Sequence, residues 1–257
     1  MKKTIMQVFQ NLVDNKTEKG GGFFLLLDPD RSSENDILHL AESAEDCGVD
    51  AVLVGTSFML NTNFHQAVKN IKGHTALPVI IFPGAHSQIS PHADAILYTS
   101  LISGRNPTYL IEEQVKGAPL IKRFGLEPIA TGYMIIESGR ATSVLYISNT
   151  RPIPRDKSDI AAAHALTAQY FGMKAVFMEA GSGADGSVPV EMIKVVSDYI
   201  DIPIIIGGGI NKPGDARKKI SAGASFVVVG NRLEECNRTA LMREFADACH
   251  PHIKETV

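Results

Sequence analysis

Eight short apolar runs, rich in β-branched and bulky aliphatic residues, recur along the chain. They begin at Phe23, Ala51, Pro78, Ala95, Pro128, Ala175, Ile202 and Phe226. Because each run is continuously apolar rather than alternating, each predicts a strand that is covered on both faces. Such strands, separated by helical stretches, form parallel sheets. Eight of them in 257 residues predict one α/β domain over residues 1–257, a (β/α)8 TIM barrel rather than an open sheet.

Helix signals lie between several of these runs. Ser33 is a good N-cap for a helix that ends near Gly48, and Ser158 for one that ends near Gly172. Pro213 is suited to the first turn of a further helix. These helices fit the crossover connections of a parallel sheet.

Two connections depart from the regular pattern. Residues 83–94 carry two prolines and one glycine, and the segment is too short and too broken for a crossover helix. We therefore expect the third helix of the barrel to be replaced by a loop. The fifth strand is expected to continue through residues 137–148, with a hairpin turn at Ser138–Ala141.

Charge and composition narrow the function classes. The net charge of -3 gives no bias toward nucleic acid or anionic membranes, so any anion must be bound by local groups. The three cysteines are widely spaced without a CxxC pair, which favours reduced thiols. No apolar run approaches the roughly 20 residues of a membrane span, and no signal peptide is evident. We expect a cytoplasmic protein with no stable membrane insertion and no nucleic-acid partner.

Glycines follow the last two predicted strands. The seventh strand ends in Gly207, Gly208 and Gly209, and the eighth ends in Gly230 and Asn231. In TIM barrels the active site lies at the C-terminal ends of the strands, and phosphate is often bound after strands seven and eight. Because glycine lets backbone N–H groups approach an anion closely, a phosphate site is predicted there. The alternative is that these glycines only shape tight turns.

The loop after the sixth strand carries a third glycine-rich segment. Its string GSGADG matches the GxGxxG pattern, but it follows the sixth strand rather than the first, which disfavours a dinucleotide site. Gly181, Ser182 and Gly183 are instead expected to offer N–H groups and a hydroxyl to an anion. Glu179, at the end of the strand, is placed to bind substrate hydroxyls or take a proton, or only to orient a neighbouring loop.

Asp28 ends the first predicted strand, and Thr56 and Ser57 follow the second. A buried carboxylate is costly unless it is paired or binds a metal, and carboxylate and hydroxyl oxygens suit Mg²⁺. The sequence therefore predicts a magnesium site, with a capped turn at Asp28 as the alternative. No DDxxD-type aspartate cluster is present, so an all-helical terpenoid site is not expected.

Basic residues follow the fourth and fifth strands. Arg105 lies after the fourth, and Arg151, Arg155 and Lys157 lie after the fifth. Either group could meet a diphosphate, although charged loops are often only solvated. There is no HExxH or GxSxG motif, so zinc proteolysis and nucleophilic acyl transfer have no support.

The ordered set LLLDPD, VGTS, FPG, SLISGRNP, NTRPIPRDK, FMEAGSGADG, IIIGGGI and VVVGN resembles the geranylgeranylglyceryl phosphate synthase family, in the branch shared by archaea and some bacteria. The resemblance runs from about Gly22 to Asn231. It implies a barrel whose third helix is replaced. It also implies transfer of a geranylgeranyl group from its diphosphate to the 3-hydroxyl of sn-glycerol 1-phosphate, with release of diphosphate.

The resemblance also implies site residues. Mg²⁺ is expected near Asp28 and Ser57. For this reaction, the position of Glu179 at the strand end makes it the catalytic candidate, which would activate or orient the attacking hydroxyl. The residues implied to bind sn-glycerol 1-phosphate are Phe177, Met178, Glu179, Ala180, Gly181, Ser182, Gly183, Gly208, Gly209, Gly230 and Asn231. Phe177 stands where the family usually has tyrosine, which puts a hydroxyl contact in doubt. A homo-oligomer is expected as well.

Three alternatives stay open at this point. One is another phosphate-binding barrel enzyme, an isomerase or lyase, which would need no prenyl diphosphate. The second is the same chemistry with a longer prenyl donor. The third is a barrel that binds a phosphate ligand without catalysis, against which the presence of both Asp28 and Glu179 argues.

Overall fold

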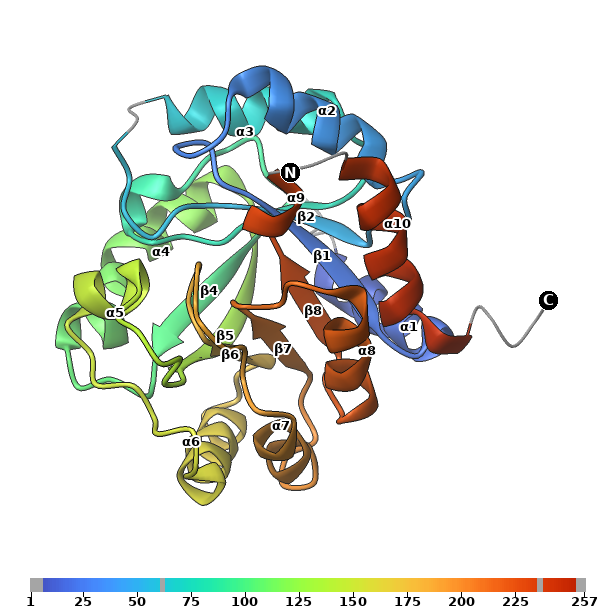
Figure 1. Cartoon of the computed structure of the whole chain (residues 1–257). Helices are drawn as coiled ribbons and strands as arrows, with labels where there is room; N and C mark the ends of the chain where they lie inside the picture. Colours follow the sequence, from blue (N-terminus) through green and yellow to red (C-terminus); the bar gives the residue numbers. More distant parts are fainter. Residues whose placement is uncertain (1–6, 61–62, 235–237, 253–257) are drawn as a thin grey trace.

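The computed structural model describes residues 7–60, 63–234 and 238–252. Its strands are all parallel and form one closed barrel in sequence order, with β1 paired to both β2 and β8 (Figure 1). The strands are β1 (Gly22–Leu27), β2 (Ala51–Val54), β3 (Val79–Ile81), β4 (Ala95–Leu101), β5 (Glu127–Ile135), β6 (Ala175–Glu179), β7 (Ile204–Gly207) and β8 (Phe226–Val229). All eight predicted strands and the TIM-barrel fold are confirmed.

Helices lie in most of the connections between strands, before β1 and after β8. They are α1 (Val8–Lys19), α2 (Glu34–Ala44), α3 (Phe64–Gly73), α4 (Glu113–Phe124), α5 (Ser143–Ser148), α6 (Ser158–Tyr170), α7 (Val190–Ser197), α8 (Pro213–Ser221), α9 (Asn231–Glu234) and α10 (Arg238–Cys249). Ser33 caps α2, because its hydroxyl accepts the Asp36 N–H at 3.3 Å. Pro213 occupies the first turn of α8, as predicted, and Ser158 is the first residue of α6.

The side chains of each strand divide between two apolar layers. On β6, Ala175 and Phe177 belong to the cluster inside the barrel, whereas Val176 and Met178 belong to the layer between strands and helices. This alternation explains the continuous apolar runs, because a parallel strand in a barrel buries both faces. It also decides which side chains at the strand ends face the barrel mouth.

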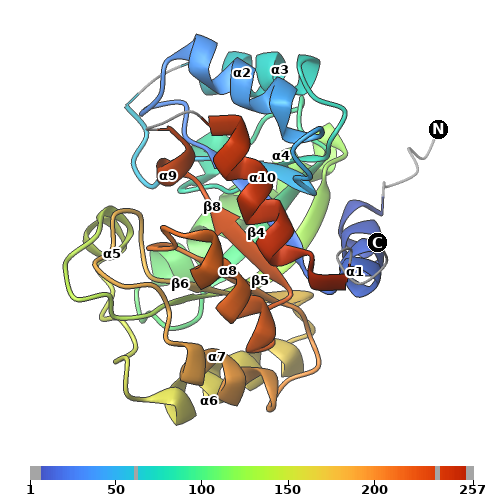
Figure 2. The same cartoon turned by 45° about the vertical axis from the view of Figure 1, so that its right-hand side comes forward.

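Helix α1 closes the N-terminal end of the barrel, and the sequence patterns did not predict it. Its buried residues Val8, Phe9 and Leu12 belong to the interior cluster, and the Phe9 ring lies 6.2 Å from that of Phe226. Figure 2 shows α1 beside the end of α10 at this face. The site must therefore lie at the opposite, C-terminal end of the strands.

A buried ionic network ties these segments together. The Asp50 carboxylate accepts hydrogen bonds from Lys19 Nζ at 2.6 Å, from the Phe23 N–H at 2.8 Å and from His250 Nε2 at 2.8 Å. Burial alone would raise the pKa of Asp50, but these partners outweigh it and lower that pKa. The network joins α1, the start of β2 and the residue after α10.

The connection between β3 and β4 confirms the predicted loss of the third helix. It contains a single 3₁₀ turn, η1 (His86–Gln88). The next connection begins α4 with a π-helical turn, η2 (Thr108–Glu112). None of the helices in the described part of the chain has the length and apolarity that a membrane span requires.

The predicted extension of the fifth strand and its hairpin turn at Ser138–Ala141 are wrong. Strand β5 ends at Ile135, and residues 143–148 form α5. Asn149, in the left-handed region at φ 48°, ends this helix. The chain then returns to make a parallel bridge between Ile136 and Ile153, which a hairpin could not form. An apolar run of six residues fits a strand or a short helix, and periodicity does not separate the two.

Candidate active site

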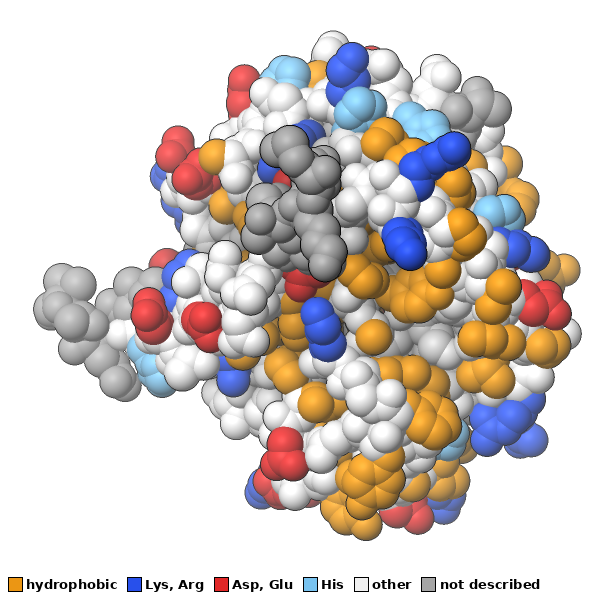
Figure 3. All heavy atoms as spheres, turned by 180° about the vertical axis from the view of Figure 1, so that it is seen from behind, with side chains coloured by type: hydrophobic (Ala, Val, Ile, Leu, Met, Phe, Trp, Pro, Cys, Tyr) orange, Lys and Arg blue, Asp and Glu red, His pale blue; other side chains and the backbone are white. Residues whose placement is uncertain are grey.

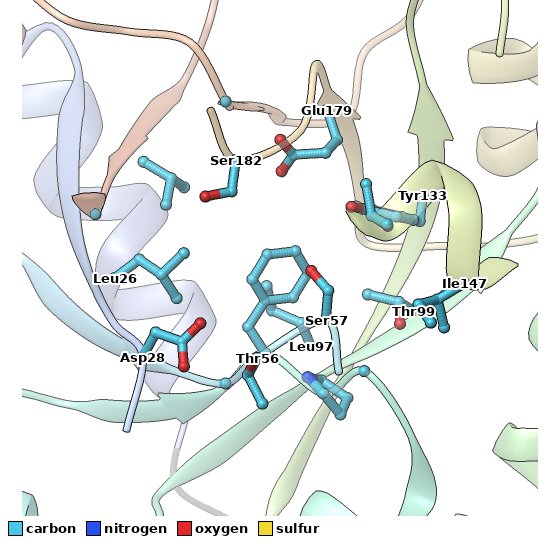
Figure 4. Close-up of a pocket in the computed structure, with 18 of the residues that line it drawn as sticks. Leu26, Asp28, Thr56, Ser57, Leu97, Thr99, Tyr133, Ile147, Glu179 and Ser182 are labelled. Atoms are coloured by element: carbon cyan, nitrogen blue, oxygen red, sulfur yellow. The ribbon is translucent and has the colours of Figure 1, made fainter. Parts of the chain in front are cut away.

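A cavity of about 420 Å³ opens at the C-terminal ends of the strands. Its polar part lies between β1 and the loops after β6, β7 and β8, and its apolar part extends along β4 and α4. Figure 4 shows Asp28 and Glu179 on opposite sides of the polar part, with both carboxylates facing the space between them. This is the position at which TIM barrels carry their active sites.

Glycines shape the polar wall of the cavity. Gly208 and Gly209 lie in the left-handed region, at φ 79° and 67°. A Cβ on Gly208 would lie 2.3 Å from Glu179 Oε1 and 2.5 Å from the Gly181 nitrogen. The loops after β6 and β7 therefore meet backbone to backbone, and glycine at 208 is required by both conformation and space.

Glu179 is the buried acid of the site. It ends β6, is 7% exposed, and its Oε1 accepts the Gly181 N–H at 2.6 Å. Burial raises the pKa of Glu179 to about 7, and the Gly181 hydrogen bond only partly opposes this rise. A carboxyl group with that pKa takes and gives a proton near neutral pH.

Tyr133 lies next to Glu179 and was not predicted from the sequence. Its ring lies edge-on to the rings of Phe82 and Phe177, with centroids 5.8 and 5.5 Å away. Burial, together with the Glu179 charge, raises the pKa of Tyr133 well above its usual range, so the phenol stays protonated. Its position depends on the register of β5, where Tyr133 pairs with Phe177 of β6, and no local motif reveals that pairing.

Asp28 follows β1 directly and faces the cavity from the other side. Its Oδ1 accepts the Asp30 N–H at 3.0 Å, and its Oδ2 lies 3.4 Å from Arg31 Nε. Burial raises the pKa of Asp28, although the Asp30 N–H, the Thr56 hydroxyl and Arg31 oppose that rise. Arg31 also donates to the Ser182 hydroxyl at 3.2 Å, so it bridges the loops after β1 and β6. Arg31 stands in the DPDR segment but was not predicted as a site residue.

The residues around Asp28 suit Mg²⁺ by their donor chemistry. Thr56 and Ser57 bring hydroxyl and carbonyl oxygens to the same wall of the cavity as Asp28. No group of three or more histidine, cysteine, aspartate or glutamate side chains that could hold a metal occurs within the described ranges. One carboxylate with neighbouring hydroxyls is too few ligands for a structural ion. This ligand set suits Mg²⁺, which usually completes its coordination sphere with substrate phosphates and water.

The structure brings most of the predicted site residues to this cavity. Those that line it are Asp28, Ser57, Glu179, Ser182, Gly183, Gly208, Gly209, Gly230 and Asn231. Phe177 lies deeper in the barrel, stacked on Phe82 at 4.8 Å, and the Met178 side chain faces the helices. Ala180 and Gly181 are buried behind the wall, where the Gly181 N–H binds Glu179.

The predicted basic residues are placed differently. Arg105 donates to the carbonyls of Ile102 and Gly104, and Arg155 donates to three other carbonyls. The lysine and arginine side chains that line the cavity, besides Arg31, are Lys212 and Arg232, which were not predicted. They follow β7 and β8, where the sequence predicted a phosphate site from its glycines alone.

The apolar part of the cavity passes to the outside of the barrel. Ile96 and Tyr98 line it, although their side chains project from the outer face of β4, while Leu97 between them projects inward. The opposite wall includes Gly117 and Ile121 of α4. This space, called the apolar arm below, lies between β4 and α4, beside the β3–β4 connection, which carries a 3₁₀ turn in place of a crossover helix.

This chain is similar to known proteins over nearly its whole length. Residues 14–249 match the family model described as the PcrB family. A geranylgeranylglyceryl phosphate synthase from Chitinophaga pinensis is 43% identical over 244 residues, covering 95% of this chain and 96% of the relative. One from Pyrococcus horikoshii is 42% identical over 240 residues, covering 93% and 94%.

A solved structure is similar over nearly the whole fold. It is (S)-3-O-geranylgeranylglyceryl phosphate synthase from Thermoplasma acidophilum in complex with its substrate sn-glycerol-1-phosphate. The TM-score is 0.90 at 33% identity, covering 96% of this chain and 99% of the other. Family model, relatives and structure agree over almost the full length, and this chain belongs to the PcrB family.

Proposed function

We propose that this protein is a prenyltransferase. It joins the geranylgeranyl group of geranylgeranyl diphosphate to the 3-hydroxyl of sn-glycerol 1-phosphate through an ether bond and releases diphosphate. One observation carries the proposal: a single cavity connects a glycine-lined polar wall, a buried acid and an apolar arm. The named relatives, and the substrate in the Thermoplasma acidophilum complex, support the same reaction.

The polar wall suits glycerol phosphate. Gly208, Gly209 and Gly230 let the backbone approach a phosphate without side chains between, and Ser182 adds a hydroxyl. Lys212 and Arg232 add positive charge to a chain whose net charge is negative. In the proposed complex the acceptor lies between these loops, with its free hydroxyls toward Glu179.

The chemistry follows from the acid and its neighbour. The bond between the allylic carbon and the diphosphate oxygen breaks, and the electron pair leaves with diphosphate. The acceptor hydroxyl oxygen forms the new bond to that carbon, and its proton passes to the Glu179 carboxylate. The Tyr133 ring lies beside this position, where its π-face can stabilise positive charge on the allylic carbon.

Asp28 and Ser57 are proposed to hold Mg²⁺. When bound, the ion would neutralise charge on the departing diphosphate. The hydrogen bond from Asp30 fixes the Asp28 carboxylate, and Arg31 adds a positive charge beside it.

The apolar arm separates this function from a sugar-phosphate isomerase or lyase. A small polar substrate would not fill the apolar arm, which is lined by Ile89, Leu101, Ile121 and Ile147. A prenyl chain buries itself there, at roughly 0.8 kcal/mol for each methylene group. Incubation with shorter and longer prenyl diphosphates tests the length of the natural donor.

The expected homo-oligomer stays a prediction. Figure 3 shows hydrophobic side chains gathered at the bottom of the molecule, where α6 and α7 lie. The exposed residues at the C-terminal ends of these helices are Tyr170, Phe171 and Tyr199. Such aromatic surface is suited to association, and light scattering in solution tests it.

The deciding experiment incubates the purified protein and Mg²⁺ with geranylgeranyl diphosphate and either sn-glycerol 1-phosphate or its 3-phosphate enantiomer. Mass spectrometry then detects the ether product. Product from the 1-phosphate alone supports both the reaction and its stereochemistry. No product from either acceptor, with shorter and longer prenyl donors also tried on folded protein, contradicts the proposal and favours the isomerase or lyase alternative.

A further inference from the structure

The loop between β6 and α7 is held from outside by two cations. Arg155 donates to the Ser187 carbonyl at 3.0 Å and the Gly186 carbonyl at 3.4 Å, and it also reaches the Glu137 carbonyl at 3.0 Å. Lys219 Nζ donates to the carbonyl of Val188, the next residue along the loop. Three consecutive loop carbonyls are therefore bound by charged side chains from two different segments.

This arrangement is electrostatically costly. Lys219 is 5% exposed, and burial lowers its pKa; the Asp215 charge opposes this, while the charges of Arg155 and Lys218 act in the same direction as burial. Within the described ranges the hydrogen-bond partners of both cations are backbone carbonyls rather than carboxylates. Two like charges kept close together without a bonded anion imply that the position of the loop matters.

The far side of the same loop touches the glycines of the cavity wall. A Cβ on Gly209 would lie 2.9 Å from the Ser187 nitrogen, so the segment that Arg155 binds rests directly on Gly209. The first half of the loop carries Ser182 and Gly183, which line the cavity. Shifting the Gly186–Val188 carbonyls would therefore move the polar wall.

We propose that Arg155 and Lys219 are positioning residues for the glycerol phosphate side of the active site. They act by drawing the carbonyls of the β6–α7 loop outward, which fixes its cavity edge against Gly208 and Gly209. The inference rests on the proposed function, since it names the acceptor as the substrate affected. It also replaces the alternative that Arg155 binds diphosphate, because its guanidinium is taken up by three carbonyls and does not line the cavity.

The chain offers a matched control on the same loop. Arg140 pairs with Asp185 at 3.5 Å, but both side chains are 60% exposed. Solvent-exposed pairs of this kind contribute little to structure. Arg140 lies between β5 and α5, so Arg140→Ala removes a cation that contacts the β6–α7 loop without removing the hydrogen bonds of Arg155 and Lys219 to its carbonyls.

The experiment compares Arg155→Met, Arg155→Lys, Lys219→Met and Arg140→Ala in steady-state kinetics with each substrate varied. Arg155→Met and Lys219→Met should raise KM for sn-glycerol 1-phosphate about tenfold or more, with KM for geranylgeranyl diphosphate changed less than about twofold. Arg155→Lys should give a smaller rise, because an ammonium group lacks the fork that spans several carbonyls. Arg140→Ala should match the wild type.

Three outcomes overturn the inference. A rise in KM confined to the diphosphate would make Arg155 a donor ligand, and unchanged KM values in a folded Arg155→Met or Lys219→Met would remove the positioning role. An effect of Arg140→Ala equal to that of Arg155→Met would mean that loop charge, not anchorage, matters. Where Arg155→Met does not fold, the comparison of Arg155→Lys with Lys219→Met decides.

A second readout separates this inference from the proposed function. Hydrogen exchange of the amides at 181–187 should quicken in Lys219→Met and Arg155→Lys but not in Arg140→Ala, whatever the reaction is. If the wild type forms no ether product but this exchange pattern holds, the positioning stands and the proposed reaction fails. If product forms but exchange is unchanged, the positioning fails alone.

Discussion

Replacing Glu179 with glutamine should strongly lower catalytic activity and stabilise the protein at the same time. Glutamine keeps an oxygen that can accept the Gly181 N–H, so the local geometry is retained. It cannot take the proton of the attacking hydroxyl, and we expect kcat/KM to fall by roughly 100-fold or more. The carboxylate that performs this step is buried, and keeping it charged there costs stability.

The size of that cost follows from the pKa. Burial raises the pKa of Glu179 from its ordinary 4.5 to about 7. At roughly 1.4 kcal/mol per pKa unit, the gap is about 3 kcal/mol. Between pH 4.5 and 7 the folded chain holds a proton that the unfolded chain has released, so stability falls as pH rises through this window. Above pH 7 the full cost is present.

Glu179→Gln removes that cost because an amide does not ionise. Its free energy of unfolding should exceed that of the wild type by up to about 3 kcal/mol at pH 8, with Tm higher by on the order of 5–10 °C, and by almost nothing at pH 4.5. Urea unfolding and calorimetry across this range measure it. Glu137→Gln, an exposed carboxylate just beyond β5, is the matched control and should change neither property.

The same ionisation should appear in the activity. The wild-type kcat/KM should rise roughly tenfold between pH 6 and pH 8 as Glu179 loses its proton. Phosphate groups of the substrates titrate in the same range, so the pH profile of residual activity in Glu179→Gln serves as the control. Full kcat/KM in Glu179→Gln, or a stability gain that does not depend on pH, would refute the reasoning.

Three further predictions test other parts of the molecule. Asp28→Ala should lower Mg²⁺-dependent turnover by roughly 100-fold or more, because it removes the one carboxylate of the proposed metal site, and a wild-type response in a Mg²⁺ titration would contradict that site. Gly117→Leu should fold, since leucine favours a helix more than glycine does, but its side chain would enter the apolar arm, because a Cβ added at 117 would lie 2.7 Å from Ile89 Cδ1. Competition between prenyl donors should then shift toward shorter chains by about tenfold, and an unchanged preference would place the chain elsewhere. Asp50→Ala should cost about 3–5 kcal/mol of unfolding free energy at pH 7, because it strips Lys19, His250 and the Phe23 N–H of their shared acceptor. Since the pKa of Asp50 is lowered, its contribution is present above pH 3.8 and is lost as pH falls below that value, which acid unfolding of the two proteins compares.

The barrel was predictable because its strands are buried on both faces. Each strand then appears as a continuous apolar run, and the short, proline-broken segment at 83–94 leaves no room for a helix. Helix α1 was missed because only Val8, Phe9 and Leu12 of it are buried, at the end of the barrel rather than along its side. The error at α5 has the opposite cause, since six mostly apolar residues favour a strand locally while the tertiary structure places a helix there.

The candidate site likewise contains residues that the sequence could place and residues that it could not. Asp28, Glu179 and the glycines stand at strand ends, where fold class alone brings residues together. Tyr133 and Arg155 depend on strand register and on contacts between distant loops. Strand ends can be located from sequence, whereas the direction of a side chain in the middle of a loop depends on tertiary contacts.

The absence of a helix between β3 and β4 affects how the hydrophobic core of the barrel is closed. No helix connects β3 to β4, so Ile96 and Tyr98 on the outer face of β4 border the cavity rather than packing fully against helices. A long apolar ligand lying in that space would serve as a removable part of the hydrophobic core. The core would then be complete only while the ligand is bound, and each release of product would reopen one side of the barrel to water.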